Sequence, residues 1–273
     1  MKKYILLLIT LTFLNTSFAF QENIEADLPE LSVGWNLWYP YQFYNKQNKL
    51  VGLDIDIAVA VAKEAGYRLT FTELPWKRHL QFVRTGIVDI AMGTSPNDKR
   101  KLYARFTKPY RFEQVALFVR KGTKHLMPFT HLADIIGSPF MIGAEDGYYY
   151  GEEFESLSKL DAFTAHIGQS LNLEHNMSLL MNEKIDGVFA DDIAMLAFAK
   201  KYKLLNDIER HSIKIHRSQI HFMVSKKTDI KVVERFSLAI DKLKANGTID
   251  RLINQWTKEA GDNSLTKPSV KEH

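Results

Sequence analysis

Apolar positions along the chain follow two periods, one typical of helices and one typical of strands. From Leu53 to Ala65 apolar residues recur every four positions, which predicts a helix over 53–66 that Gly66 ends. Strands are predicted at 31–35, 67–74, 88–93 and 114–122, and a second helix is predicted at 75–86. This alternation of helices and strands predicts an α/β fold with largely parallel sheets.

A second run of the same kind follows a change of composition near residues 121–139. Its predicted strands are 140–145, 161–167, 187–192 and part of 211–227, and its predicted helices are 170–184, 192–200, 229–245 and 248–260. Asn246 and Gly247 break the chain between the last two helices. The two runs together predict two similar halves.

Residues 84–96 and 182–194 share one pattern. Each segment ends a helix, places an aspartate (Asp89 or Asp186), continues as a short apolar strand and enters a loop that starts another helix. Two similar lobes would set these loops opposite each other across a cleft, and ligands of open α/β sheets bind at the carboxyl ends of strands. The alternative is a chance match between two short strand–turn–helix segments.

The first residues form a separate unit. Lys2 and Lys3 precede an apolar run at 4–14, and small residues follow up to Ala19. This layout predicts a secretory signal peptide over 1–19, and the run is shorter than a membrane span. The chain has no cysteine, which a lipid anchor after the signal would need, so we expect an unlipidated protein of a Gram-negative periplasm. The polar residues 261–273 predict a disordered tail.

Composition narrows the classes of function. Hydrophobic residues make up 45% of the chain and charged residues 25%, as in a globular protein with a substantial core. The formal net charge is +4 and the basic residues are scattered, which argues against a nucleic-acid partner. Without cysteine there are no thiolate sites, and the nine histidines lack metal-ligand spacing. We therefore expect neither a metal nor a cofactor.

The segment SPNDKRKLYARFTKPY, residues 95–110, concentrates basic side chains directly after a predicted strand. Ser95 is a favoured N-cap and Pro96 a favoured first helical residue, so a helix is predicted to begin at Ser95. The free N–H groups of its first turn favour an anion. Arg100, one turn further, can direct two N–H donors onto a carboxylate, which a lysine cannot. The alternative is a surface helix with solvated charges.

Several segments resemble the family 3 extracellular solute-binding proteins, the polar amino-acid-binding proteins of ABC importers. The most specific feature is an ordered set: Gly93, Ser95, Arg100 five residues after it, and then the aromatic–Thr–Lys–Pro–Tyr run at 106–110. The segments LVGLDIDIAVAVAKEAG, VALFVRKG, DGVFADDIA and IDKLKANGTIDRLINQW extend the resemblance over roughly residues 28–258. All of them occur in order behind the predicted signal peptide.

The resemblance implies the type II periplasmic-binding-protein fold. In that fold two lobes, each a mixed and mostly parallel sheet flanked by helices, are joined by two hinge strands and trap a ligand between them. Lobe 1 is expected to comprise residues 23–119 plus 220–260, and lobe 2 residues 120–219.

Carried over by position, the resemblance also implies roles for individual residues. Arg100 would bind the α-carboxylate of the ligand, with help from Ser95 and from the backbone at Gly93. Asp191 matches the carboxylate that takes the α-ammonium group, and its neighbour Asp192 is not expected to bind. A simple N-cap for the helix that follows is the alternative role of Asp191.

Two loops depart from the family pattern. The loop after the first strand carries Asn36 where the family usually has an acidic residue, and it is one residue shorter. The second-lobe loop reads EDGYYYGEEF, residues 145–154, in place of a Gly-Thr-Thr-like sequence. Gly147 still permits a close backbone approach, whereas Tyr148 replaces a small hydroxyl residue. Asp146 is a candidate replacement for the missing acid, with a solvated loop position as the alternative.

The predicted cleft is rich in aromatic residues, whose faces suit a stacked ring or a cationic side chain. The candidates are Trp35, Trp38, Tyr39, Tyr41, Trp76 and Tyr148. Packing in the core or at the hinge is the alternative for each of them. Trp76 opens a helix directly after a strand and is therefore the strongest candidate for the first-lobe wall, while Arg78 is expected to lie outside.

These observations predict a monomeric periplasmic protein that captures an amino acid or a similar carboxylate-bearing solute and passes it to an inner-membrane ABC permease. One alternative is a subunit that presents its ligand to a membrane sensor. Another is a dehydratase-like enzyme on the same fold, with His79, His166 or Glu145 as acid or base. No pairing of these groups in the sequence requires catalysis, so we expect no enzymatic activity.

Overall fold

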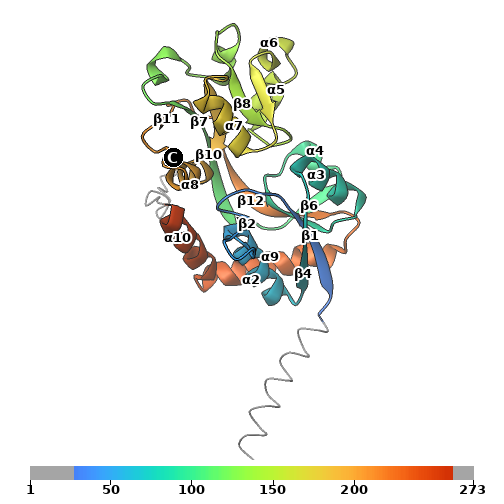
Figure 1. Cartoon of the computed structure of the whole chain (residues 1–273). Helices are drawn as coiled ribbons and strands as arrows, with labels where there is room; N and C mark the ends of the chain where they lie inside the picture. The colour runs from blue at the N-terminus through green and yellow to red at the C-terminus, as the bar shows by residue number, and fades with distance from the viewer. Residues whose placement is uncertain (1–27, 261–273) are drawn as a thin grey trace, which may run out of the picture.

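Two long strands run through the middle of the molecule and belong to both of its halves (Figure 1). They are β7 (Arg111–Arg120) and β12 (His216–Ser225), which pair antiparallel with each other in this computed structural model, where residues 28–260 are described. The sheet that contains them has the order β4-β1-β5-β12-β7-β10-β8-β9, with β6 (Ala104–Phe106) on β12 and β11 (Ile208–Arg210) on β7.

The first lobe is a sheet covered by helices on both faces. Strands β1 (Glu30–Trp35), β4 (Arg68–Glu73) and β5 (Ile90–Thr94) pair in parallel. One face packs against α2 (Leu53–Ala65), α9 (Ile230–Ala245) and α10 (Thr248–Ala260), and the other packs against α3 (Trp76–Thr85). A short helix α4 (Asp98–Lys101) and the hairpin of β2 (Phe43–Tyr44) and β3 (Leu50–Val51) complete this lobe.

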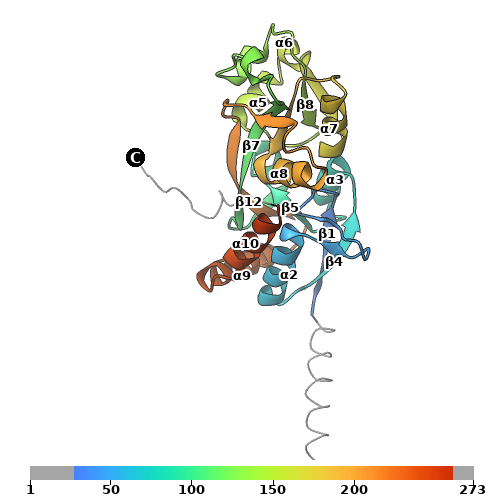
Figure 2. The same ribbon diagram turned by 60° about the vertical axis from the view of Figure 1, so that its left-hand side comes forward.

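The second lobe repeats this plan on the other side of the long strands. Strand β8 (Ile142–Glu145) pairs in parallel with β9 (Ile167–Ser170) on one side and with β10 (Gly187–Asp191) on the other. Strand β10 also pairs antiparallel with β7. Its helices are α5 (Glu152–Leu157), α6 (Asp161–Thr164), α7 (Leu173–Met181) and α8 (Asp192–Lys201), with 3-10 turns η1 (Lys124–Leu126) and η2 (Leu132–Ile135). Helix α8 lies toward the first lobe and packs against α10 (Figure 2).

The α/β class and the two-lobed architecture were predicted correctly, and so were most elements. The strand predicted at 161–167 is wrong, because Asp161–Thr164 forms helix α6 and β9 begins only at Ile167. Phe163, Ala165 and Ile167 alternate as in a strand, but only Phe163 is fully buried, while Ile167 packs partly buried against the same core and Ala165 is exposed. A single helical turn buries Phe163 and leaves its neighbours exposed, so the apparent alternation does not reflect a two-sided strand.

The two sequence segments that share a pattern occupy equivalent places in the two lobes. Asp89 precedes β5, and its Oδ2 accepts a hydrogen bond of 2.9 Å from the N–H of Ser32 on the neighbouring parallel strand. Asp186 precedes β10, and its Oδ2 accepts a hydrogen bond of 2.8 Å from the N–H of Met141, next to the neighbouring parallel strand. Each aspartate therefore ties the start of one strand to its neighbour, and each strand then ends at the gap between the lobes.

The predicted lobe boundaries, 119/120 and 219/220, fall within β7 and β12 and stay predictions. The predicted signal peptide, 1–19, and the predicted disordered tail, 261–273, lie outside the described residues. Within the part of the chain that is described, no helix combines the length and the apolar character that crossing a bilayer requires.

A close contact between Gly34 and His79 sets the distance between β1 and α3. A Cβ atom on Gly34 would lie 2.3 Å from the His79 ring, which is buried under the strand with Nε2 3.3 Å from the Ile90 carbonyl oxygen. The strand and the helix in contact here carry Asn36 and Trp76 toward the gap between the lobes.

We predict that Gly34→Ala lowers the free energy of unfolding by about 1–3 kcal/mol, because the added methyl group overpacks the His79 ring. Gly168 in β9 is a matched control, since a methyl group on that residue would lie 3.8 Å from the nearest atom. Urea unfolding of both variants measures the difference, and equal stabilities for Gly34→Ala and Gly168→Ala would show that the contact imposes no such limit.

Candidate functional site

A pocket lies where the two lobes meet. It is lined by Asn36, Trp38, Gln42, Trp76, Met92, Gly93, Ser95, Arg100, Glu113, Glu145, Tyr148 and Tyr149. Asn36 directly follows β1, Gly93 lies near the end of β5, and Glu145 ends β8, so strands of both lobes contribute residues at their carboxyl ends.

The structure brings together most of the residues predicted to bind a ligand. Those that line the pocket are Asn36, Trp76, Gly93, Ser95, Arg100 and Tyr148, and those that lie outside its lining are Tyr39, Gly147 and Asp191. Gly147 and Asp191 are linked to the pocket by hydrogen bonds, as described below. Tyr39 instead packs on the core of the first lobe, with its ring 4.8 Å from that of Phe43.

Arg100 is a buried cation that has no acidic partner among the described residues. It is 5% exposed, and its Nη1 donates to the Ser95 carbonyl at 2.9 Å while its Nη2 donates to the Gly147 carbonyl at 3.2 Å. A guanidinium group offers five N–H donors, so three stay available within the pocket. Burial lowers the pKa of Arg100 from its ordinary value, although Tyr103 and Glu113 act in the opposite direction.

The N-cap of the helix predicted at Ser95 lies two residues later, at Asn97, and the helix is short. Helix α4 starts at Asp98, and Asn97 is its N-cap, with extended backbone and a side-chain oxygen 2.8 Å from the Arg100 N–H. The Ser95 hydroxyl lies instead 2.8 Å from that of Ser218 on β12. Asn97 therefore caps the first turn, while Ser95 contacts the hinge strand β12 and lines the pocket.

The Gly147 carbonyl joins the second lobe to the first. It accepts hydrogen bonds from Arg100 and, at 3.0 Å, from Trp76 Nε1, and the Arg100 guanidinium lies 5.5 Å from the Trp76 ring centroid. Gly147 has φ +79°, a conformation that favours glycine and turns this carbonyl toward the first lobe. Next to it, the buried hydroxyl of Tyr148 has no hydrogen-bond partner among the described residues. The tight turn therefore brings both a backbone acceptor and an unpaired hydroxyl to the site.

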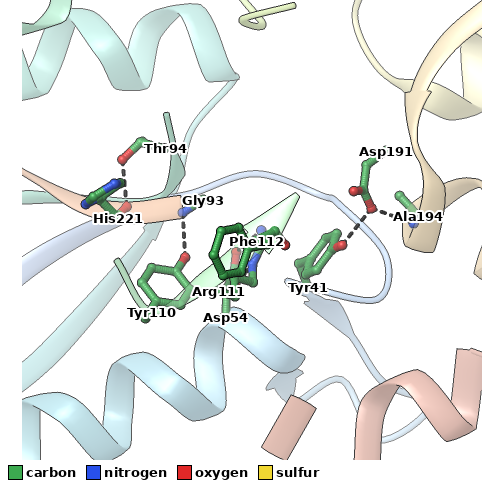
Figure 3. A network of polar contacts seen from close by, with 10 residues as sticks. All are labelled: Tyr41, Asp54, Gly93, Thr94, Tyr110, Arg111, Phe112, Asp191, Ala194 and His221. Atoms are coloured by element: carbon green, nitrogen blue, oxygen red, sulfur yellow. Dashed lines mark hydrogen bonds and ion pairs between the residues drawn. The ribbon is translucent and has the colours of Figure 1, made fainter. Parts of the chain in front are cut away.

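A buried ion pair between Arg111 and Asp54 fixes the elements next to the pocket residue Gly93 (Figure 3). Arg111, at the start of β7, donates from Nε and Nη2 to the two carboxylate oxygens of Asp54 at 2.7 and 2.9 Å. The guanidinium lies 4.0 Å from the ring centroid of Tyr41, and the hydroxyl of the neighbouring Tyr110 accepts a hydrogen bond of 2.8 Å from Gly93 N–H. Strand β7, helix α2 and the end of β5 are thereby held in one fixed arrangement.

Asp191 lies one layer behind the pocket lining. Its Oδ1 accepts from the Tyr41 hydroxyl at 2.6 Å and from the Ala194 N–H at 2.9 Å, so it is the N-cap of α8 and also joins the two lobes (Figure 3). Its Oδ2 is buried and has no partner among the described residues. Burial raises the pKa of Asp191, although the positive charge of Arg111 acts in the opposite direction.

Two glutamates in the pocket were not predicted as binding residues. Glu113 on β7 is 5% exposed, and burial together with the negative charge of Asp191 raises its pKa well above the ordinary value. Glu145, considered above only as an acid or base, has a pKa raised to about 8 by burial and by the charge of Glu174. An acidic residue two positions before the apolar strand residues 115–119 was the one available signal for Glu113.

The pocket contains four further residues outside the predicted set: Trp38, Gln42, Met92 and Tyr149. Trp38 had been named among the aromatic candidates, and it packs edge-on against Tyr148 with ring centroids 6.0 Å apart. The Gln42 Oε1 atom is buried without a hydrogen-bond partner in the described part of the chain. Trp35 and Tyr41 are core residues, which is the alternative given for aromatic candidates.

The remaining candidate residues do not line the pocket. Asp146 pairs with Lys77 at 3.0 Å, and Arg78 is exposed as expected. His79 is buried under β1, and His166 contacts two backbone groups, the Phe140 carbonyl at 3.2 Å and the Gly137 N–H at 3.3 Å. Among residues 28–260 no three histidine, aspartate or glutamate side chains gather as a metal site.

Comparison with known proteins identifies relatives over almost the whole described chain. The model of the bacterial extracellular solute-binding proteins, family 3, matches residues 31–259. The probable histidine-binding protein of Campylobacter jejuni is 26% identical over 221 residues, covering 81% of this chain and 81% of that protein. The arginine-binding extracellular protein ArtP of Bacillus subtilis is 21% identical over 261 residues, covering 94% of this chain and 98% of that protein.

Solved structures share the fold. The substrate-binding protein of an ABC uptake transporter from Streptococcus pneumoniae, with bound histidine, superposes with a TM-score of 0.73 and 21% sequence identity. The match covers 91% of this chain and 97% of that one. This likeness confirms the two-lobed fold of periplasmic binding proteins that the sequence resemblance implied.

We predict that Glu145 makes the protein less stable as the pH rises. A carboxyl group with a pKa of about 8 in the folded protein keeps its proton there, while the unfolded chain loses it near its ordinary value of 4.5. The free energy of unfolding therefore falls between these two pH values, by about 3–5 kcal/mol for a shift of this size.

Glu145→Gln removes this contribution, so the variant should gain about 3–5 kcal/mol relative to the parent protein between about pH 5 and about pH 8. Urea unfolding at the two pH values measures the gain. Glu234→Gln, on the exposed side of α9, is the control and should show no such gain. A pH-independent difference between Glu145→Gln and the parent would contradict the assignment.

Proposed function

Because the chain belongs to the bacterial extracellular solute-binding proteins, family 3, we propose that it captures an amino acid or a similar carboxylate-bearing solute between its lobes and delivers it to an inner-membrane ABC permease. The observation that carries the proposal is Arg100, a buried guanidinium in the interlobe pocket with two backbone acceptors and no acidic partner in the described residues.

An acid group on the ligand supplies the charge that Arg100 lacks. Arg and carboxylate form two parallel N–H···O bonds, and these are stronger than the bonds to neutral carbonyl oxygens that Arg100 makes here. Closure of the lobes removes water from this pair, which strengthens the interaction because a dry site screens charge weakly. The ligand therefore favours the closed arrangement, in which Arg100 and the Gly147 segment face each other.

The neighbouring residues complete the site. Ser95 and the backbone at Gly93 flank the acid group, and Trp76 and Tyr148 form walls on the side of each lobe. Asn36 contributes an amide at the end of β1, where an acidic residue is usual in the family. Asp191 adds negative charge behind the pocket, which favours an ammonium group on the ligand.

Membership of this family also supports a proposal for the location of the protein in the cell. We infer export through the signal peptide predicted at 1–19, residence in the periplasm without a lipid anchor, and action as a monomer. We also infer that the protein binds without catalysis: of the three acid–base candidates only Glu145 lines the pocket, while His79 and His166 are held elsewhere in the fold. The arginine-binding and histidine-binding relatives named above support binding without catalysis, and the extracellular one supports export.

We predict that Arg100→Ala weakens binding a hundredfold or more. Removing one partner of a buried ion pair costs about 3–5 kcal/mol, and 1.4 kcal/mol corresponds to a factor of ten in affinity. A thermal-shift screen of amino acids and related acids first selects the ligand, because a ligand that binds the folded state raises its apparent stability. Isothermal titration calorimetry then compares the parent and Arg100→Ala.

Lys101→Ala is the matched control, since Lys101 neighbours Arg100 on α4 but is exposed and pairs only with Asp98 among the described residues. It should leave the affinity within about twofold of the parent, as expected for an exposed ion pair. An unchanged affinity in Arg100→Ala would remove this residue from the site and overturn the proposal.

A further inference from the structure

Glu113 brings a carboxylate into the pocket from the hinge rather than from either lobe. It lies on β7 directly opposite Ser218 of β12, and residues opposite each other in an antiparallel pair present their side chains on the same face, about 5 Å apart. The Ser218 hydroxyl is 2.8 Å from that of Ser95, and the Ser95 carbonyl accepts from Arg100. Glu113 is therefore close to the end of the pocket where Arg100 lies.

The Glu113 carboxylate has no cation of its own. It makes no ion pair and accepts no side-chain hydrogen bond from residues 28–260, although it is 5% exposed. Arg111, two residues away, is occupied by both oxygens of Asp54. Asp54 and Asp191 both add negative potential at Glu113, while Arg111 and Arg100 add positive potential. A cationic group of a ligand beside Glu113 would therefore supply the positive charge that its ionised form lacks.

Asp191 is less well placed for direct contact with a ligand. Its Oδ1 already accepts two hydrogen bonds, from Tyr41 and from Ala194. Its Oδ2 has no partner among the described residues but is buried, and the residue is absent from the pocket lining. Glu113 lines the pocket and has both oxygens available. A further acceptor, the buried Oε1 of Gln42 in the same lining, also has no partner among the described residues. The unpaired groups beside the acid-binding end are thus acceptors, which call for a donor-rich cation.

We propose that Glu113 binds the α-ammonium group of the ligand directly and that Asp191 acts through Tyr41 and helix α8 as a positioning residue. This inference rests on the proposed function and refines it: the pocket selects α-amino acids over the corresponding acids that lack the amino group. In an α-amino acid the ammonium and carboxylate groups are attached to the same carbon atom. Glu113 and Arg100 likewise lie close together in the pocket lining. The hinge strand is thus part of the recognition surface.

The test compares two ligands on three proteins. The ligands are the amino acid selected by the thermal-shift screen and its des-amino analogue, and the proteins are the parent, Glu113→Gln and the exposed control Glu234→Gln. Calorimetry should show that Glu113→Gln weakens binding of the amino acid by about ten- to a hundredfold, the range for a lost charge-assisted hydrogen bond. Binding of the des-amino analogue should change by less than about threefold or should improve, because the repulsive charge is gone.

Asp191→Asn and Glu113→Asp separate direct contact from positioning. Glu113→Asp keeps the charge but shortens the side chain, so it should recover part of the lost selectivity for the amino acid. Asp191→Asn should weaken both ligands by a similar factor, since it perturbs the arrangement of the lobes. Thermal unfolding of each variant establishes that it is folded. If Glu113→Gln does not fold, the ligand pair on Glu113→Asp and on the parent decides the question.

Two results would overturn the inference: an equal effect of Glu113→Gln on both ligands, or loss of selectivity for the amino acid in Asp191→Asn alone. These results are distinct from failure of the proposed function, in which the parent protein binds no amino acid of the screen or Arg100→Ala binds as the parent does.

Discussion

The buried ion pair between Arg111 and Asp54 is the interaction on which the arrangement of the site depends. It joins the start of the hinge strand β7 to helix α2, and both side chains are excluded from solvent. Loss of one member of such a pair leaves an unpaired buried charge, which costs about 3–5 kcal/mol. The pair also carries Tyr41 on its guanidinium face and so supports the Tyr41–Asp191 hydrogen bond between the lobes. The pocket is built on the strand that this pair fixes.

The ionisable groups at the gap between the lobes differ in whether they have a partner of opposite charge. Arg111 is fully paired with Asp54, whereas Arg100 is held by backbone carbonyls alone and Glu113 and Glu145 have no paired cation among the described residues. A stable core rarely keeps buried charges unpaired, because the desolvation cost is large. An unpaired cation beside carboxyl groups whose pKa values are raised by burial is consistent with the proposed site for a zwitterionic ligand, whose ammonium group would favour the ionised form of such a carboxyl.

Much of the fold could be predicted because hydrophobic periodicity and glycine or proline breaks are local properties. The helix at Leu53–Ala65 ends at Gly66 as predicted, and the strands that end at Thr94 and Asp191 were located from their apolar runs. The helix at Asp161–Thr164 was missed, since one buried phenylalanine in a short turn resembles an alternating strand. The start of α4 was misplaced because Ser95 and Asn97 are both good caps, and only the contact with Ser218 decides between them.

The site was harder to predict than the fold. Arg100 and Ser95 were found through an ordered motif, and the structure places both in the pocket. No sequence motif marks Glu113. Its position in the pocket depends on the pairing of β7 with β12, two strands about a hundred residues apart in the sequence. Likewise, Tyr41 was grouped with possible cleft aromatics, but its hydroxyl joins Asp191 in the other lobe. Contacts of this kind depend on tertiary pairing, which the local pattern does not encode.

A crystal structure of the complex with the ligand found by screening tests the central claim most directly. Arg100 should then hold the ligand's acid oxygens at about 2.7–2.9 Å, as in other guanidinium–carboxylate pairs, inside the gap between the lobes. A ligand bound elsewhere, or one whose acid group lies beyond reach of Arg100 while that side chain keeps only its carbonyl partners, would contradict the account.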